Sequence, residues 1–482
     1  MRLALVVLLL AGGVARAQPA ESAERADDAF DVMNLLSRRG LHDLNDEWWN
    51  VYGQVTWIEQ GKLPFHAAYT NFGGSTSSLS TAYENSFTGS FTIFSGLRLW
   101  PGAELYFAPE AISEQPLSNL HGLGGVIQNF ELQKGGTPTP TVYYSRLYVQ
   151  QTLGFGGERQ TVTSNPGALG KHQDARRVVV SFGRFSVLDF FDKNSYASDL
   201  RREDFDMAFM TYAAYDFVAD TRGYTWGAVA ELYFDDWSAR FMRAAPPKHP
   251  NQTELDFRFW DAYGDQLELE HDHVIAGQPG AVRVLGYHNH ETMGNFTDAI
   301  LAFQADPTRS AAGCEAAGLI HYSSTNPNAP DLCWVRKPND KYGIGINIEQ
   351  AIAKDLGVFM RAMYADGQTE VYAFTPTDRS FSIGALARGA RWCRRKDYAG
   401  VAFAANGISQ EHVNYLKLGG IDGFIGDGKL NPGTETVTEA FYGANLTSSI
   451  WLSGDYEFIV HPAFNADRGP VHVFGARLHA EF

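Results

Sequence analysis

The sequence predicts an all-β protein, a single-chain antiparallel β-barrel that crosses a membrane with its strands. From residue 49 onward, stretches of about ten residues alternate apolar with polar or small side chains. A period of two gives a strand one apolar and one polar face. Phenylalanine, tyrosine and tryptophan gather at the ends of these stretches, as they do at the two interfaces of a membrane barrel. The chain ends on an aromatic residue, Phe482, that directly follows such a stretch.

The composition excludes several other classes of protein. The 482 residues include 39 Lys or Arg and 55 Asp or Glu, so the formal net charge is −16, whereas a general nucleic-acid binder needs a basic surface. Hydrophobic residues make up 44% of the chain, which excludes a disordered protein. The length alone would fit two or three soluble domains, but the alternation runs on without a domain break.

The N-terminus has the pattern of a secretory signal peptide. Arg2 gives a basic start, residues 3–14 are almost all apolar, and Ala15 and Ala17 fit the small-x-small cleavage rule. A membrane anchor is the alternative, but a helical span needs about 20 apolar residues. We therefore predict that residues 1–17 are removed and that the protein is exported through the periplasm.

The next segment, residues 18–47, is polar and mixed in charge. Within it, Phe30 to Leu36 and then Gly40 predict a short helix that ends at the glycine. We expect a periplasmic N-terminal segment here, followed by a barrel over residues 48–482.

The predicted strands are clearest at the C-terminus. One side of the last strand carries Phe474, Ala476, Leu478, Ala480 and Phe482, and the other carries Gly475, Arg477, His479 and Glu481. The same alternation occurs over 86–99, 225–233, 341–349, 356–364 and 450–460. About sixteen or seventeen such segments lie between Trp49 and Phe482.

Two architectures fit alternating strands of this kind. In a soluble sandwich the apolar face is the core, whereas in an outer-membrane barrel it meets lipid and the polar face lines a lumen. The barrel is favoured because the strands have about the length of a tilted span. Closure also pairs every backbone group, which a sheet in lipid requires.

The connections at one end of the barrel are expected to be long. The irregular pieces are 109–141, 156–175, 244–263, 291–340 and 407–434. We expect 109–141 to fold into the lumen, because it is long, rich in glycine and poor in charge.

The long loop 291–340 holds two of the three cysteines. Cys314 and Cys333 are 19 residues apart, and Cys393 stands alone. In an oxidising compartment a Cys314–Cys333 disulfide would close a surface loop. Cys393 remains an alternative partner for either cysteine.

Several ordered motifs resemble the carbohydrate-selective porin family of the OprB type. They are LRLWPGAELYF at 97–107, RLYVQQT at 146–152, GRF at 183–185 with DFFD at 189–192, DTRGYTWG at 220–227, APPK at 245–248 and NADRGP at 465–470. The resemblance runs from about Trp49 to Phe482 and departs mainly in loops, including 301–340. It implies a sixteen-stranded barrel in the bacterial outer membrane that passes mono- or oligosaccharides by passive diffusion, without chemical turnover or a cofactor.

Two other functions stay open. One is a general diffusion porin without sugar preference, and the other is a secreted, soluble, β-rich protein that binds or hydrolyses glycans. The expected partners of the porin are its sugars, outer-membrane lipid and the barrel assembly machinery, which would read Phe482. The sequence leaves monomer and homotrimer open, because a lipid-facing stripe and a subunit-facing stripe look alike.

A sugar channel needs side chains that exchange hydrogen bonds with hydroxyl groups and then release them. Arginine and glutamate supply donor forks and acceptor pairs, and aromatic rings offer flat apolar faces. By strand parity the lumen candidates are Arg98, Glu104, Tyr106, Arg146, Tyr148, Glu231, Arg240, Glu268, Glu349, Arg361, Glu457 and Arg477. We expect several of them to meet at a constriction. The alternative is a solvated wall residue or a cross-strand ion pair.

Other chemistry is not predicted. His271 and His273, and likewise His288 and His290, would share a strand face, but neither pair has an identifiable third ligand in the sequence. The chain has no Gly-x-Ser-x-Gly elbow and no Walker motif. It also offers no pair of carboxylates that the sequence places at a glycosidase spacing. We therefore predict neither a metal site nor an enzyme.

Overall fold

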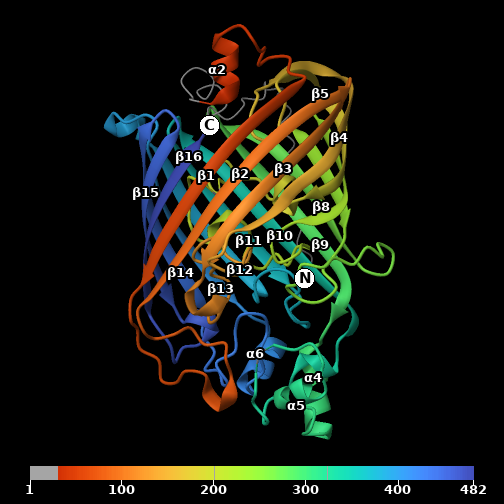
Figure 1. Ribbon diagram of the computed structural model, residues 1–482, viewed down its shortest axis with the longest axis vertical. Helices are drawn as coiled ribbons and strands as arrows, with labels where there is room; N and C mark the ends of the chain where they lie inside the picture. Colours follow the sequence, from red (N-terminus) through yellow and green to blue (C-terminus); the bar gives the residue numbers. More distant parts are fainter. Residues whose placement is uncertain (1–30, 200, 323) are drawn as a thin grey trace.

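The computed structural model describes residues 31–199, 201–322 and 324–482. Sixteen antiparallel strands in these residues close into one barrel (Figure 1). Each strand pairs with its neighbours in the chain, and the ring closes where β1 (Trp49–Lys62) pairs with β16 (Val471–Glu481). The predicted fold class and strand number are confirmed. The predicted signal peptide, residues 1–17, lies outside the described residues.

The remaining elements follow in chain order. The strands are β2 (Glu84–Trp100), β3 (Ala103–Gln115), β4 (Thr141–Val162), β5 (Lys171–Phe185), β6 (Thr225–Phe234), β7 (Trp237–Ala244), β8 (Tyr263–Ile275), β9 (Gln278–Met293), β10 (Lys337–Ala353), β11 (Leu356–Ala365), β12 (Arg379–Arg388), β13 (Tyr398–Gly407), β14 (Glu435–Thr447) and β15 (Ile450–Val460). The α-helices are α2 (Val32–Arg38), α3 (Met207–Met210), α4 (Phe296–Ala305), α5 (Ala311–Ala316) and α6 (Gln410–Lys417). In the described part of the chain, no helix is long and apolar enough to cross a membrane.

The two ends of the barrel differ in their connections. One end, at the top of Figure 1, carries most of the short turns, helix α2 and the C-terminus; we call it the short-turn end. The other end, the long-loop end, carries α4, α5 and α6 (Figure 1). Helix α2 begins after Asp31, whose carboxylate accepts a hydrogen bond from the Asn34 amide, as a helix N-cap does. It lies beside β1, where the Val51 amide donates to the Met33 sulfur.

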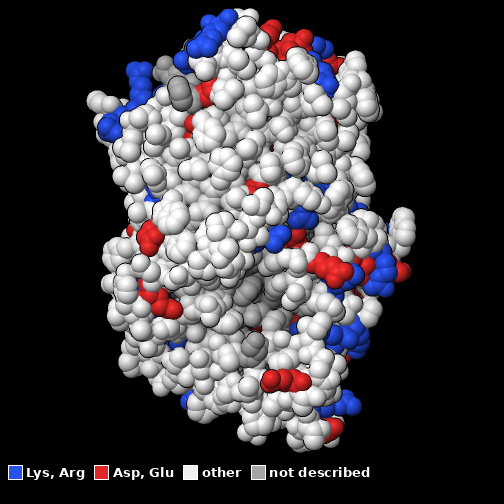
Figure 2. All heavy atoms as spheres, in the orientation of Figure 1, with Lys and Arg blue, Asp and Glu red and all other residues white. Residues whose placement is uncertain are grey.

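The alternation in the sequence separates the two faces of the wall. Val55 and Trp57 of β1 are exposed on the outside, while Thr56 and Ile58 between them are buried inside. Figure 2 shows a largely uncharged surface over the upper part of the barrel, with Lys, Arg, Asp and Glu more frequent at the top rim and in the lower half. An apolar outer face and a polar inner face are what a barrel in lipid requires.

Two connections from the long-loop end fill much of the interior. We call residues 186–224 the inner loop. Its described residues are largely buried, and Phe205, Tyr212 and Tyr215 pack with Tyr287 of the wall. Residues 121–132 join them, with Phe130 and Leu132 in the same cluster. The sequence did not mark 186–224 as a loop. Its apolar side chains resemble those of wall strands because both are buried against the same core.

The structure corrects two predicted loop boundaries. Residues 109–115, expected at the start of the 109–141 loop, belong to β3. Much of 156–175, expected to be irregular, lies in β4 and β5. These parts of β4 and β5 carry polar and small side chains on both faces, so they lack the alternation by which strands were recognised.

Candidate solute pathway in the barrel interior

Arg361 of β11 holds the inner loop against the wall. Its side chain is only 1% exposed. The Nε atom lies 3.0 Å from Asp192 Oδ1, Nη1 donates to the Phe209 carbonyl at 2.6 Å, and Nη2 donates to the Ala197 carbonyl at 2.9 Å. A guanidinium group that is desolvated and bonded in this way fixes the loop rather than facing open water.

Arg477 of β16 makes a second anchor. Its Nη2 atom donates to the Glu203 carbonyl at 2.7 Å, and the guanidinium carbon lies 4.1 Å from the centre of the Phe205 ring. Wall carboxylates add further anchors, because Glu439 accepts the amides of Phe205 and Asp206 at 2.6 and 3.0 Å. The inner loop is therefore held from β11, β14 and β16.

Charged side chains from five neighbouring strands form a continuous ladder on the part of the wall that continues from β11. We call it the charge ladder; it consists of Glu231, Arg240, Glu268, Glu270, Arg283 and Glu349 on strands β6 to β10. Arg240 lies 3.3, 2.9 and 2.6 Å from Glu231, Glu268 and Glu270. Arg283 lies 2.9 Å from Glu270 and 3.1 Å from Glu349.

The charge ladder also contacts the inner loop. Glu268 accepts the Asp192 amide at 2.8 Å, and Glu349 accepts both the amide and the hydroxyl of Ser195, at 2.7 and 2.9 Å. Glu268 and Glu349 of the ladder therefore support the inner loop. At the other side of the ladder, Glu231 and Arg240 lie near Lys193 of the inner loop, together with Arg146 and Asp189; we call the region around Lys193 the charge-ladder space.

Lys193 marks this space as open to water. It belongs to the inner loop, yet its side chain is exposed, although both neighbours, Asp192 and Asn194, are buried. The charges that act on it come from Asp189, Arg146, Arg240 and Glu231. Arg146 binds Asp189 through two hydrogen bonds, at 2.8 and 2.6 Å.

Aromatic rings lie next to these charges. The Tyr233 hydroxyl donates to Glu231 at 2.7 Å, and the Arg177 guanidinium lies 3.9 Å from the centre of the Tyr233 ring. Tyr148 packs with Phe190 of the inner loop, with ring centres 6.0 Å apart. The space therefore combines charged donors and acceptors with flat apolar faces.

The short-turn end contains a cavity of about 270 Å³. We call this cavity the vestibule. Its lining includes Asn34 of α2, Tyr52, Tyr398, Trp451 and Arg202 of the inner loop. The Arg202 guanidinium lies 5.3 Å from the centre of the Trp451 ring. The vestibule combines aromatic rings with charged side chains, as the charge-ladder space does.

The structure places the predicted lumen residues in four groups. Around the charge-ladder space or on the ladder lie Arg146, Tyr148, Glu231, Arg240, Glu268 and Glu349, whereas Arg361, Glu457 and Arg477 lie between the wall and the loops; of these nine residues all but Arg146 are buried. Glu104 and Tyr106 bond to each other at 2.8 Å, and Glu104 also binds Lys171 at 2.5 Å. Arg98 binds Asp46 at 2.6 Å, ahead of β1 at the short-turn end.

Sequence reasoning missed Lys193, Asp189 and Arg283. Arg283 shares its strand face with the buried Leu285 and Tyr287, so parity could have found it. Lys193 and Asp189 lie in a loop, where no periodic signal assigns a side chain to the lumen.

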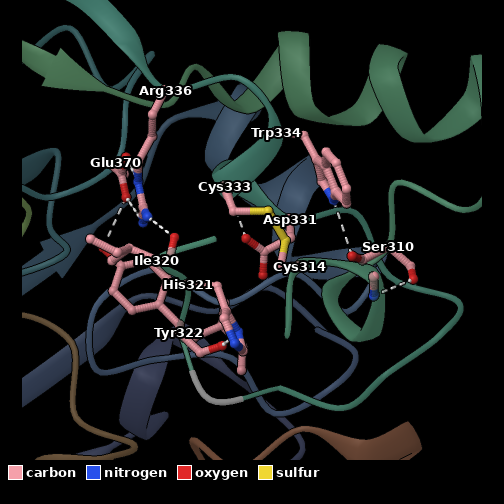
Figure 3. Close-up of a disulfide and its surroundings, with 12 residues drawn as sticks. Ser310, Cys314, Ile320, His321, Tyr322, Asp331, Cys333, Trp334, Arg336 and Glu370 are labelled. Carbon is pink, nitrogen blue, oxygen red and sulfur yellow. Dashed lines mark hydrogen bonds and ion pairs between the residues drawn. A yellow bond between two sulfur atoms is a disulfide. The ribbon is translucent and has the colours of Figure 1, made fainter. Parts of the chain in front are cut away.

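The long-loop end is braced by a disulfide between Cys314 and Cys333 (Figure 3). Ser310 caps α5 by accepting the Gly313 amide, and its carbonyl accepts the Trp334 indole N–H at 3.1 Å. Arg336 binds Glu370 through two hydrogen bonds of 2.8 Å, which link the disulfide loop to the next loop. The free Cys393 is exposed in the turn between β12 and β13, at the other end of the barrel.

The two histidine pairs lie at wall strands rather than in the charge-ladder space. His288 Nε2 and His290 Nδ1 both contact Asp340 Oδ1, at 2.8 and 2.9 Å. His271 stacks on Trp237, and His273 contacts Gln350 at 3.0 Å.

Comparison with known proteins gives one family match. The family model described as "Carbohydrate-selective porin, OprB family" matches residues 77–482. No curated protein sequence matches the chain.

Solved structures with a similar fold include several porins. The high-pH structure of Pseudomonas putida OprB has a TM-score of 0.61 at 15% identity, covering 90% of this chain and 94% of that chain. The low-pH structure of the same protein has a TM-score of 0.46 at 13% identity, over 93% and 96%. An anion-selective porin from Comamonas acidovorans has a TM-score of 0.46 at 10% identity, over 90% and 99%.

Proposed function

The chain belongs to the carbohydrate-selective porin family OprB and is a sugar channel of the bacterial outer membrane, and from this premise we propose a path for the sugar. The sugar enters at the long-loop end, passes the charge-ladder space beside Lys193 and leaves through the vestibule. The observation that carries this path is the exposed Lys193 side chain among Arg146, Asp189, Glu231 and Arg240 inside the barrel.

The chemistry of the charge-ladder space suits a polyhydroxylated solute. Each sugar hydroxyl donates one hydrogen bond and accepts others, so carboxylates and guanidinium groups at one place can replace its lost hydration. The Tyr233 ring beside Glu231 adds an apolar face for the sugar ring. Because the donors and acceptors already satisfy one another along the ladder, a hydrogen bond to the sugar replaces an existing one, so the sugar binds weakly enough to leave.

The buried candidates have a different role in this proposal. Arg361 and Arg477 donate to carbonyls of the inner loop, and they act as positioning residues that set the width of the path. Glu457 lies beside Gln60 of β1 at 3.0 Å and supports the wall. Glu104 and Tyr106 stabilise the strand β3 side of the lumen.

The proposal extends to the route by which the protein reaches the membrane. Residues 1–17 direct export into the periplasm, and the barrel assembly machinery recognises the terminal strand with Phe482. In the folded barrel, Phe482 and Gly53 exchange two backbone hydrogen bonds, at 2.7 and 2.9 Å. The short-turn end is periplasmic, as in bacterial outer-membrane barrels. The channel works by diffusion without turnover, as a monomer or a homotrimer.

Planar-bilayer recordings with sugar titration test the path. We expect sugars to reduce the ion current in a saturable way, and Glu231→Gln to weaken this block. Loss of a hydrogen bond to a charged group costs about 1.5–3 kcal/mol, so the half-saturating sugar concentration should rise about ten-fold. Glu254→Gln is the matched control, because Glu254 lies on an exposed outer loop, bound to Lys248.

Two outcomes would contradict the proposal. If Glu231→Gln and Glu254→Gln gave the same sugar block as the unmodified protein, the path would not run along the charge ladder. If liposomes swelled equally fast with sugars and with zwitterions of matched size, the channel would have no sugar preference and would be a general diffusion porin.

A further inference from the structure

Three carboxylates on two neighbouring strands point into one buried space. Glu439 of β14 and Asp455 and Glu457 of β15 are 0%, 8% and 0% exposed. Glu439 and Glu457 are directly paired in the sheet register. One oxygen from each of the three groups lies within 4.8 Å of the others. We call these three residues the carboxylate triad.

The inner loop brings more negative charge to the same place. Asp204 and Asp206, 2% and 0% exposed, interact electrostatically with Glu439. Of the arginines that act on Asp204, Arg361 is already paired with Asp192, and Arg477 contributes one positive charge. Five buried carboxyl groups thus face one guanidinium group that is not paired with a carboxylate, that of Arg477, and burying charge without compensation is strongly unfavourable.

Oxygen atoms in this space lack hydrogen-bond donors. Within the described part of the chain, Asp455 Oδ1 and Oδ2, Glu457 Oε2, Asp204 Oδ1 and Asp206 Oδ2 accept no hydrogen bond from an N–H or hydroxyl donor. The Asp455 carboxyl contacts those of Glu439 and Glu457, and Arg477 Nε and Nη1 are the nearby donors without a partner among the described residues. Buried polar atoms are nearly always bonded in native proteins, so the excess of free acceptors over the free N–H groups of Arg477 indicates a further positively charged group that the side chains do not supply.

A neutral side chain points to the same ligand. Gln60 of β1 is 1% exposed and donates from Nε2 to Glu457 Oε1 at 3.0 Å and to the Gln128 carbonyl at 2.7 Å. Its carbonyl oxygen, Oε1, has no donor among the described residues. Gln60 and Asp455 both flank Gly475 in the sheet. Gln60 Cγ, Asp455 Cβ and Phe205 Cε2 lie 3.3, 3.2 and 3.2 Å from the position of a Cβ on Gly475, so the two polar side chains share one small space with the Phe205 ring. An amide oxygen is therefore held beside the triad.

We propose that the carboxylate triad, with Gln60 and the inner-loop aspartates beside it, binds one Ca²⁺ ion. The donors are all oxygens from carboxylates and an amide, which is the set that Ca²⁺ prefers. Two ligands on opposite sides of an ion with bonds of about 2.3–2.6 Å lie about 5 Å apart, and the triad oxygens lie within this limit. Mg²⁺ fits less well, because it demands a regular octahedron and usually keeps several waters.

The ion would also hold the inner loop in place. The Glu439 carboxylate accepts the amides of Phe205 and Asp206 in the inner loop. A cation bound to Glu439 keeps this carboxylate ionised, and the ionised form is the one that accepts both amides. The inference does not depend on the sugar path, because the triad lies on β14 and β15 and the charge ladder lies on β6 to β10.

Metal analysis of the detergent-purified full chain tests the site. After EDTA treatment, incubation with Ca²⁺ and removal of free ion, we expect about one Ca²⁺ per chain and a higher midpoint of thermal unfolding than in EDTA. Asp455→Asn combined with Glu439→Gln should abolish both effects. Glu291→Gln is the matched control, because Glu291 is a buried wall carboxyl, 1% exposed, whose two oxygens also lack partners among the described residues.

Three results would overturn the proposal. First, the unmodified chain could retain no Ca²⁺ and unfold at the same temperature with EDTA and with Ca²⁺. Second, the double variant could retain Ca²⁺. Third, Glu291→Gln could lose as much Ca²⁺ as the double variant. If the double variant fails to fold, the comparison of EDTA and Ca²⁺ on the unmodified chain still decides. Sugar-dependent block of the ion current reports separately on the proposed sugar path.

Discussion

Arg361 and Asp192 form an ion pair, with 3.0 Å between Nε and Oδ1, that joins strand β11 to the inner loop. Their side chains are 1% and 0% exposed. The same guanidinium group also donates to the carbonyls of Phe209 and Ala197. One wall residue therefore holds three separate points of a loop that fills much of the lumen.

Replacing Arg361 should loosen the inner loop. Arg361→Ala leaves Asp192 buried and unpaired, which typically costs about 3–5 kcal/mol. We expect a lower midpoint of heat-induced unfolding, measured by gel mobility, and a larger, noisier single-channel conductance. Arg159→Ala is the control, because Arg159 is 68% exposed in its pair with Asp174 and exposed pairs are worth about 0–1 kcal/mol. Unchanged conductance in Arg361→Ala would show that the loop is held without this pair.

Reversing the charge of Lys193 should change ion selectivity. Lys193 is exposed inside the barrel among Asp189, Glu231 and two arginines. A unit charge at about 4 Å in water is worth about 1 kcal/mol, so Lys193→Glu should shift the cation-to-anion permeability ratio several-fold toward cations. The reversal potential in a salt gradient measures this ratio. Lys248→Glu on an exposed outer loop should leave it nearly unchanged, and an equal shift in both variants would mean that Lys193 does not line the path.

The wall could be predicted from sequence because each strand has two chemically different surroundings. In β16 the parity that carries Phe474 and Leu478 faces outward, and the parity that carries Arg477 and His479 is buried inside. Parity therefore assigned all the lumen candidates to the inner side of the wall. It could not separate a partly exposed side chain, such as Arg146, from one that is fully buried between the wall and a loop, such as Arg361.

The inner loop could not be predicted for a physical reason. A loop that packs inside a barrel buries its aromatic residues, as Phe209 and Tyr215 do, so its composition resembles that of a wall strand. Asp189 and Lys193 lie in this loop and contribute to the charge-ladder space only through its fold. The sequence motif at 189–192 pointed to a family, but it did not indicate that Asp189 lies inside the barrel next to the charge ladder.

Breaking the Cys314–Cys333 disulfide should affect the outer loop and not the barrel. The bridge joins residues 19 apart, and closing a loop of about this length contributes about 3 kcal/mol. We expect Cys314→Ser with Cys333→Ser to speed protease cleavage within 294–336, while the gel-mobility midpoint of the barrel stays the same. Cys393→Ser is the control, since Cys393 is free and exposed. Slower cleavage in the absence of the bridge, or no change, would contradict this role.

The contact between two outer loops should weaken as pH rises from about 4 to about 7. His412 of α6 lies 3.1 Å from Asp378 and 3.3 Å from Asp422, and Asp422 also accepts the Val371 amide at 3.0 Å. Burial raises the pKa of Asp422 from 3.8 to about 7. In this pH range the folded loop keeps a proton that the unfolded loop has lost, so stability falls with rising pH by up to about 1.4 kcal/mol per pH unit.

Asp422→Asn removes this titration and should flatten the pH profile between about 4 and about 7. The rate of protease cleavage within 408–434, corrected for protease activity at each pH, measures the stability of the loop. The paired Asp378 does not add to the effect in this range. Its pKa is lowered, with His412 opposing the effect of burial, so its contribution is lost only at still lower pH. Asp306→Asn, at a half-exposed position after α4, should keep the slope of the unmodified protein. A slope that persists in Asp422→Asn would assign the titration to another group in these loops.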